Sequence, residues 1–150
     1  MDETHYNLHR SLGYQATLTS RVFERRLEDG LRALGLTRLG WCILLAIGEE
    51  GLHSPSDIAD FIGTDRTATS RALRQLEADG LIARRTHARD RRRTDVSLTD
   101  AGKDRLMRAI SVAAENNEHF KSKLSEQDTA ALMDLLERLR SGERTRLTNF

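Results

Sequence analysis

The spacing of apolar residues constrains the fold of this 150-residue chain more than any other feature. Over residues 5–78, and again beyond residue 99, apolar side chains recur every three to five positions, which is the pattern of amphipathic helices. The pattern changes between residues 81 and 98, where two short apolar segments, 81–83 and 95–98, flank a polar connection. Such a pair of segments is typical of a β-hairpin. The sequence therefore predicts a mainly helical protein with one small hairpin.

Glycines and capping residues divide the helical part of the chain into six helices. Gly35 is the expected end of the first helix, and Thr37 is the expected cap of the second. A serine cap at Ser54, followed by proline in the first turn, begins the third helix. The predicted ranges are 5–34, 37–51, 55–62 and 65–78, followed by two helices capped by Thr99 and Ser125.

The order of these elements limits the fold class. A short helix over 55–62, followed at once by a longer one over 65–78, matches a helix-turn-helix whose second helix is the recognition helix. A hairpin directly after it makes the lobe a winged helix. We expect one structural domain, with the winged helix-turn-helix lobe, 37–99, between an N-terminal dimerisation helix, 1–36, and C-terminal dimerisation helices, 100–150. The outer helices carry more apolar surface than so small a lobe can cover, so they predict a homodimer.

Positive charge is concentrated in one part of the chain. The net charge is only +1, but residues 64–94 contain nine arginines against four acidic residues, whereas 1–63 and 95–150 are net negative. The nine, called the arginine island below, are Arg66, Arg71, Arg74, Arg84, Arg85, Arg89, Arg91, Arg92 and Arg93. A basic island in an otherwise acidic chain is typical of a nucleic-acid-binding face.

The predicted recognition helix carries polar residues that suit contact with DNA. Residues off its apolar face are Arg66, Thr67, Ser70, Arg71 and Arg74. An arginine can bind O6 and N7 of guanine with two hydrogen bonds, and short hydroxyls reach phosphates or base edges. A charged outer face is also ordinary for a surface helix, so this pattern alone leaves DNA binding and plain solvation both open.

The connection between the two predicted strands points to DNA more strongly. Four guanidinium groups lie at its protruding tip, from Arg89, Arg91, Arg92 and Arg93. One carboxylate, that of Asp90, cannot neutralise four cations, so the tip favours an external anion. An arginine-rich tip suits the minor groove, whose A·T segments have an enhanced negative potential. By spacing we expect Asp90 to pair with Arg92 and to orient it.

Three segments resemble the MarR-type winged helix-turn-helix regulators. Residues 90–102, Asp-Arg-Arg-Arg-Thr-Asp-Val-Ser-Leu-Thr-Asp-Ala-Gly, resemble the wing signature of that family: Asp-x-Arg, an apolar strand and Leu-Thr-x-x-Gly. Residues 54–59 and 74–82 are similar to its helix-turn-helix in order and spacing. Thr69 stands where an aliphatic residue is usual and Ala68 where a hydroxyl is frequent, so we expect an altered base preference.

The resemblance implies an obligate homodimer, built from the first, fifth and sixth helices, that binds a pseudo-palindromic operator as a repressor. The recognition helices would enter successive major grooves while the wings reach the adjacent minor grooves. It also implies a small effector, often an anionic aromatic, between the dimer helices and the lobe. Candidates to line that pocket are Tyr14, Trp41 and Leu45, with Arg21 meeting a carboxylate.

Some members of this family sense oxidants through a thiol or bind zinc, and both alternatives have candidate residues. Cys42, the single cysteine, lies in the apolar segment 41–47 and is expected to be a buried structural thiol. His5 and His9 are one helical turn apart but lack a matched third ligand, so we expect surface residues and no metal or cofactor. A further alternative is a winged-helix module that binds proteins and no longer binds DNA.

Two further function classes are not expected. No nucleophile–base pairing, phosphate loop or zinc-hydrolase spacing occurs, so the sequence does not predict an enzyme. No apolar run approaches the ~20 residues that a membrane span needs. The first residues lack the basic-then-apolar order of a signal peptide, so a cytoplasmic protein is expected.

Overall fold

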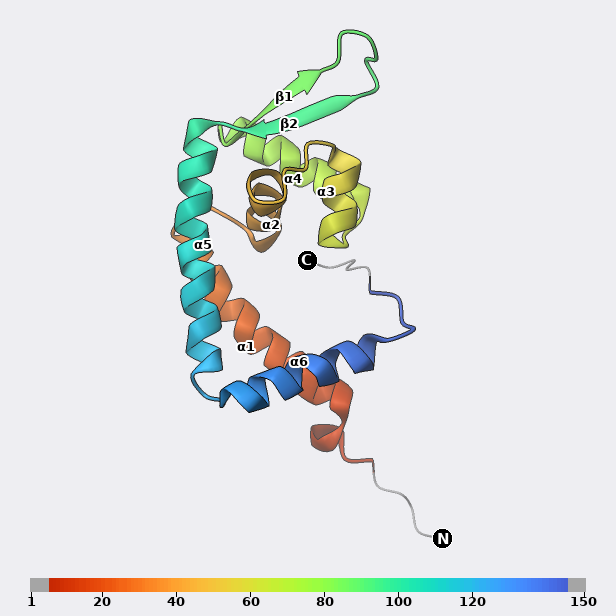
Figure 1. The fold of residues 1–150 in the computed structure, drawn as a ribbon, viewed down its shortest axis with the longest axis vertical. Coiled ribbons are helices and arrows are strands. Elements are labelled where there is room, and N and C mark those ends of the chain that lie inside the picture. Colours follow the sequence, from red (N-terminus) through yellow and green to blue (C-terminus); the bar gives the residue numbers. More distant parts are fainter. Residues whose placement is uncertain (1–5, 146–150) are drawn as a thin grey trace.

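The computed structural model describes residues 6–145, which form six α-helices and one hairpin (Figure 1). The predicted fold class, a mainly helical winged helix-turn-helix, is confirmed. A 3₁₀ turn, η1, precedes the first α-helix. The elements are η1 (Leu8–Arg10), α1 (Leu12–Arg32), α2 (Arg38–Gly48), α3 (Pro55–Ile62), α4 (Arg66–Ala78), β1 (Ile82–Thr86), β2 (Thr94–Leu98), α5 (Asp100–Lys121) and α6 (Glu126–Arg140).

The first helix begins later than the apolar spacing predicts. A continuous helix was expected over 5–34, but α1 starts at Leu12 after an extended residue, Ser11 (ψ 139°). The Ser11 hydroxyl accepts a hydrogen bond from the backbone N–H of Tyr14 at 3.3 Å, so it caps α1 and separates it from η1. The expected starting residue, His5, lies outside the described residues.

Most other helix starts follow from the capping residues. The Thr37 hydroxyl accepts from the N–H of Gly40, and the Thr99 hydroxyl accepts from the N–H of Gly102, both at 3.0 Å. Ser125 caps α6 in the same way. These bonds satisfy backbone donors that have no partner within a helix, so the first turns are fixed by local sequence.

The hydrophobic core lies in the lobe, between α2, α3, α4 and the base of the hairpin, and α5 closes it. Ile43 and Leu44 of α2, Ile58 of α3 and Leu73 of α4 are fully buried there. At Gly102, in the first turn of α5, an added Cβ atom would overlap with the carbonyl group of Leu81. A glycine is therefore required for α5 to start directly over the chain that leads into the hairpin.

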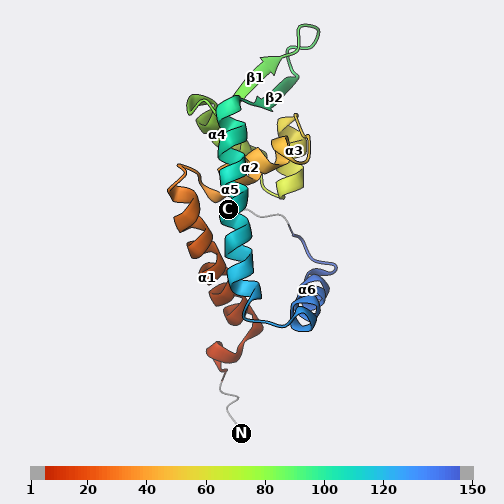
Figure 2. The same cartoon turned by 60° about the vertical axis from the view of Figure 1, so that its left-hand side comes forward.

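The outer helices extend away from the lobe. α5 runs away from the hairpin and packs against α1, which extends beyond the end of α5 (Figures 1 and 2). α6 then leaves at an angle and stands clear of α1 and α5 in Figure 2, and no residue of α6 is buried. The apolar face of α6 is therefore uncovered within one chain.

Candidate nucleic-acid interface

The helix α4 presents its polar residues on one side because its other side is anchored in the core. Asp65 caps the helix, accepting from the N–H of Ala68 at 2.7 Å, and Leu73 and Leu76 are buried. The five predicted contact residues of this helix are all exposed, namely Arg66, Thr67, Ser70, Arg71 and Arg74. The structure thus brings them together on a single solvent-facing side.

Thr69 lies on the buried side of α4. It is 1% exposed, and its hydroxyl donates to the backbone carbonyl of Asp65 at 2.9 Å. A hydroxyl in the core costs little when it has such an acceptor. Thr69 therefore does not face solvent. Of the two positions from which an altered base preference is expected, Thr69 and Ala68, only Ala68 could contact a base.

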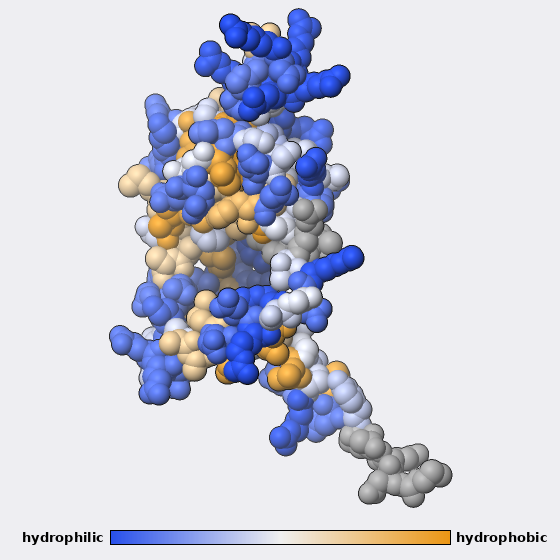
Figure 3. Space-filling view, turned by 45° about the vertical axis from the view of Figure 1, so that its right-hand side comes forward, coloured by the Kyte–Doolittle hydropathy of each residue, from blue (hydrophilic) through white to orange (hydrophobic). Residues whose placement is uncertain are grey.

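The hairpin follows α4 in the chain and protrudes from the lobe (Figure 1). β1 and β2 pair antiparallel from Ile82 opposite Leu98 to Thr86 opposite Thr94, so β1 continues three residues beyond the predicted segment 81–83. Cross-strand pairing carries the strand through polar residues that the apolar pattern alone did not include. The four tip arginines are exposed, and Figure 3 shows hydrophilic residues covering the protruding hairpin.

Asp90 contacts Arg92 through the backbone. Its carboxylate accepts from the N–H of Arg92 at 3.0 Å, and its carbonyl accepts from the N–H of Arg93 at the same distance. Within residues 6–145, no carboxylate pairs with the Arg92 guanidinium. The predicted partner is right, but the predicted side-chain pairing is not observed, because the carboxylate shapes the turn at the tip.

Two side-chain contacts of the hairpin could not be foreseen from the sequence. His87 lies 2.7 Å from Asp95 across the base of the tip, measured from Nε2 to Oδ2. Arg84 Nε lies 3.2 Å from Oε2 of Glu77, on the last turn of α4. Among the described residues, Arg84 is the one arginine of the island that pairs with a carboxylate, so the other eight leave a strongly positive end of the molecule.

The four predicted pocket residues have different surroundings within one chain. Arg21 is exposed, whereas Tyr14 is half-buried and packs edge-on against the ring of His9. Trp41 and Leu45 are half-buried and pack against the lobe core. The indole N–H of Trp41 is shielded from solvent and has no acceptor in the described part of the chain.

A groove of about 560 Å³ lies elsewhere, between α1 and α5. Its polar lining includes Arg25, Arg26, His119 and Lys123. Loss of hydration, with the positive charges of Arg26 and Lys123, lowers the pKa of the His119 imidazole. Asp29 and Glu115 also line the groove, so it combines side chains of both charges with the apolar walls of two outer helices.

The redox and metal alternatives gain no support from the described residues. Cys42 is half-buried, and burial raises the pKa of its thiol to about 11, although the nearby Arg38 charge opposes the shift. No three His, Cys, Asp or Glu side chains lie close enough to hold a metal ion within residues 6–145. The His5–His9 pair cannot be assessed, because His5 lies outside that range. None of the helices described is long and apolar enough to cross a membrane.

Comparison with known proteins agrees with this geometry. The MarR family model matches residues 34–93. An uncharacterized HTH-type transcriptional regulator, YdgJ of Bacillus subtilis (strain 168), is 32% identical over 128 residues, which cover 85% of this chain and 76% of that protein.

Solved structures share the fold. A mutant MarR from E. coli, complexed with operator DNA, superposes with a TM-score of 0.78 at 22% identity and covers 85% of this chain and 92% of its own. The PcaV transcriptional regulator from Streptomyces coelicolor, in complex with its natural ligand, gives 0.81 at 21% identity, covering 91% and 96%. The chain therefore belongs to the MarR family, as a winged helix-turn-helix, DNA-binding transcriptional regulator and not an enzyme.

Proposed function

We propose that this protein is a homodimeric, ligand-responsive repressor that binds a pseudo-palindromic operator. The observation that carries the proposal is that seven of the nine arginines of the island lie on two exposed surfaces. One surface is the outer side of α4 and the other is the wing tip, residues 87–93. A helix side and a protruding hairpin at one end of a molecule match the major and minor grooves of one DNA duplex.

Each surface has a distinct proposed role. Arg71 and Arg74 contact base edges in the major groove, where an arginine can bind guanine through two hydrogen bonds. Arg66, Thr67 and Ser70 fix the position of α4 by contacting phosphates. At the wing, guanidinium groups of Arg89, Arg91, Arg92 and Arg93 enter the minor groove, and Asp90 keeps the turn in shape.

A second copy of the chain is the proposed partner of the outer helices. Their large apolar side chains are exposed in one chain: Leu12, Leu18, Val22 and Phe23 in α1, and Leu132, Met133, Leu135, Leu136 and Leu139 in α6. Uncovered apolar area of this extent is expected at a subunit interface. A two-fold symmetric dimer would present two α4 helices to the two halves of a pseudo-palindrome.

The proposed effector site lies between the dimer helices and the lobe. PcaV, a structural relative, holds a natural ligand, which supports a ligand-responsive mechanism for a chain of the same fold. The unpartnered indole N–H of Trp41 supports a site on α2, and Arg21 of α1 is the proposed partner of an anionic, aromatic effector. Leu45 and Tyr14 would supply apolar walls. The regulator would act in the cytoplasm, on the DNA that it binds.

A titration of labelled DNA tests the core of this proposal. The DNA is the region upstream of the protein's own gene, and fluorescence anisotropy is measured at several salt concentrations. We expect two protomers per site, far tighter binding than to random DNA, and affinity that falls steeply with salt because several arginines displace counterions. Equal binding to both DNAs would exclude an operator, and no binding to either would favour the protein-interaction alternative.

A further inference from the structure

We propose that Arg84 and Glu77 form a positioning pair that fixes the angle between the wing and the recognition helix. The inference rests on the proposed function, in which α4 and the wing contact neighbouring grooves of one duplex. Glu77 lies on the last turn of α4, Arg84 lies at the centre of β1, and Nε of the arginine is 3.2 Å from Oε2 of the glutamate. The pair therefore joins the two DNA-contacting elements directly.

Arg84 differs from the other arginines of the island in where it lies. It faces the same side of the hairpin as the buried Ile82 and stands opposite the buried Val96 in the strand register. Its side chain is 28% exposed, and two of its nitrogens, Nε and Nη2, are shielded from solvent and make no hydrogen bond among the described residues, so the attraction to Glu77 is one between charges. Arg84 would have to leave Glu77 and this inner face to reach a phosphate, so its charge is directed toward the protein.

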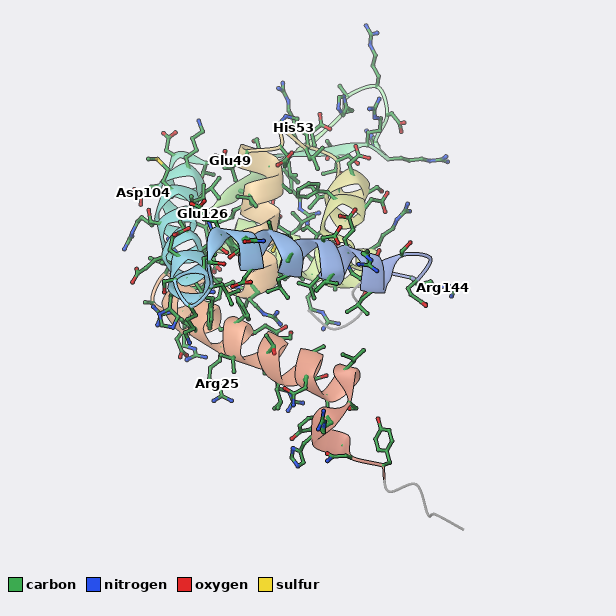
Figure 4. All side chains as sticks on the ribbon, turned by 60° about the horizontal axis from the view of Figure 1, so that its bottom comes forward. Arg25, Glu49, His53, Asp104, Glu126 and Arg144 are labelled. Atoms are coloured by element: carbon green, nitrogen blue, oxygen red, sulfur yellow. The ribbon has the colours of Figure 1, made fainter. Side chains whose placement is uncertain are left out.

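The start of β1 is already held, because the N–H of Leu81 donates to the carbonyl of Leu76 and the N–H of Thr99 donates to the carbonyl of Leu81. The pair acts three residues further along the chain, at Arg84. On the opposite strand, the N–H of Val96 donates to the carbonyl of His53 at 2.8 Å, and the His53 ring lies 3.0 Å from the carbonyl of Val96. Figure 4 shows His53 at this base. β2 is thus tied to the link between α2 and α3, while β1 is tied to α4 through Arg84 and Glu77.

Beyond Arg84 and Val96, the described hydrogen bonds of the hairpin are made within the hairpin. The described hydrogen bonds of the tip, such as those from Arg93 to Asp90 and from His87 to Arg93, join one part of the hairpin to another. A strand advances about 3.3 Å per residue, so the tip arginines lie well beyond the last attachment point. A small rotation at Arg84 would therefore become a larger displacement of the tip.

The direction in which Glu77→Gln changes operator affinity distinguishes a positioning role from a direct effect of charge on DNA binding. Glu77→Gln removes a negative charge beside the DNA face, and this change alone would strengthen binding to a polyanion. A positioning role predicts the reverse: at least five-fold weaker operator binding, because the freed guanidinium no longer holds the wing. Arg84→Gln should weaken binding to a similar extent, and the double variant should be no weaker than either single one, since both remove the same pair.

Hydroxyl-radical footprinting and the salt dependence complete the test. Both variants should lose protection at the minor-groove flanks, keep it at the centre, and lower the salt slope to the same extent, because the displaced tip arginines release fewer counterions. Arg85→Gln is the matched control, because Arg85 carries the same charge on the exposed side of the same strand. Flank protection should persist in that variant. If either single variant melts below the assay temperature, the exchanged pair Glu77→Arg with Arg84→Glu decides, and it should restore flank protection.

Three results would overturn the inference. Glu77→Gln could bind as tightly as wild type or tighter, the exchanged pair could fail to restore protection, or Arg84→Gln could lower the salt slope by about one while Glu77→Gln leaves it unchanged, as the loss of a phosphate contact by Arg84 alone would. Arg92→Ala, measured in parallel, separates the two levels of the proposal. Unchanged affinity in that variant would contradict the wing assignment itself, whereas a loss there without a loss in Glu77→Gln would contradict only the positioning pair.

Discussion

The lobe and the outer helices differ in how completely one chain covers their apolar surface. In the lobe, Ile43, Leu44, Ile58 and Leu73 have no exposed surface, and the core continues into the base of the hairpin. In α6 no residue is buried, and Leu139 is 61% exposed. The core of the lobe is thus covered within one chain, with Leu31 of α1 and Leu106 of α5 packed into it, whereas the apolar face of α6 is not covered. In the proposed dimer each protomer would form its own DNA-contacting side, and dimerisation would set only the placement of the two sides.

We expect the largest effect on operator affinity from a substitution on the uncovered apolar face of α6. Leu136→Asp places a charge on the uncovered apolar face, so we expect the dimer to dissociate and operator affinity to fall at least a hundred-fold, because each half-site then binds alone. Light scattering after gel filtration and anisotropy measure the two losses. Glu137→Gln, on the same turn, is the control and should leave both unchanged. A dimeric Leu136→Asp protein would show that α6 lies outside the interface.

A core substitution in the lobe sharpens the comparison. Leu73→Ala should lower the free energy of unfolding by about 2–5 kcal/mol, the usual cost of truncating a fully buried leucine. Urea unfolding at several protein concentrations measures it. We expect this loss to be independent of concentration, whereas the loss from Leu132→Ala in α6 should vary with concentration, because the contact forms between chains. If the stability loss varied with protein concentration in the same way for both variants, the lobe core would not be complete within one chain.

Within the DNA-contacting side, Arg71→Ala tests the helix. The exposed guanidinium would lose its contact with a base edge, so operator affinity should fall by about 1–3 kcal/mol and sequence preference should relax. Binding to operator and to random DNA is compared by anisotropy. An equal loss on both DNAs would mean that Arg71 touches only phosphate. Arg32→Ala, an exposed arginine of α1, is the control.

Arg92→Ala tests the wing in the same range, about 1–3 kcal/mol of operator affinity. The loss should be greatest on operators with A·T-rich flanks, where the minor groove is narrow. Gel-shift titration on flanks of different composition measures it. Affinity unchanged on every flank would remove the tip from the interface.

The smallest effect is expected at Cys42. Its pKa is raised to about 11, so the thiolate forms only as the pH approaches that value, and at pH 8 roughly one thiol in a thousand is ionised. We expect slow alkylation at pH 8 that accelerates as pH rises, and operator binding that peroxide does not change. Cys42→Ser serves as the control. Release of DNA by peroxide in wild type but not in Cys42→Ser would establish a redox sensor.

Elements fixed by local sequence could be predicted, and contacts between elements could not. Helical spacing and hydroxyl caps such as Thr37 and Thr99 placed the six helices and the hairpin, because those signals act within a few residues. The break at Ser11 was missed because an apolar pattern can continue through a capped turn. The bonds of Arg84 and Asp90 were missed or misjudged for another reason: they depend on strand register and turn shape, which emerge only when the hairpin pairs.

The start of α5 has a consequence for operator choice. The Thr99 hydroxyl donates to the carbonyl of Gly80 at 2.6 Å, and α5 begins directly against Leu81, so this helix is joined rigidly to the hairpin. Its 22 residues span about 33 Å, close to one turn of DNA at about 34 Å. In the proposed dimer the distance between half-sites becomes a property of α5. An effector that tilts α5 would release the operator by changing that distance while leaving each DNA-contacting side intact.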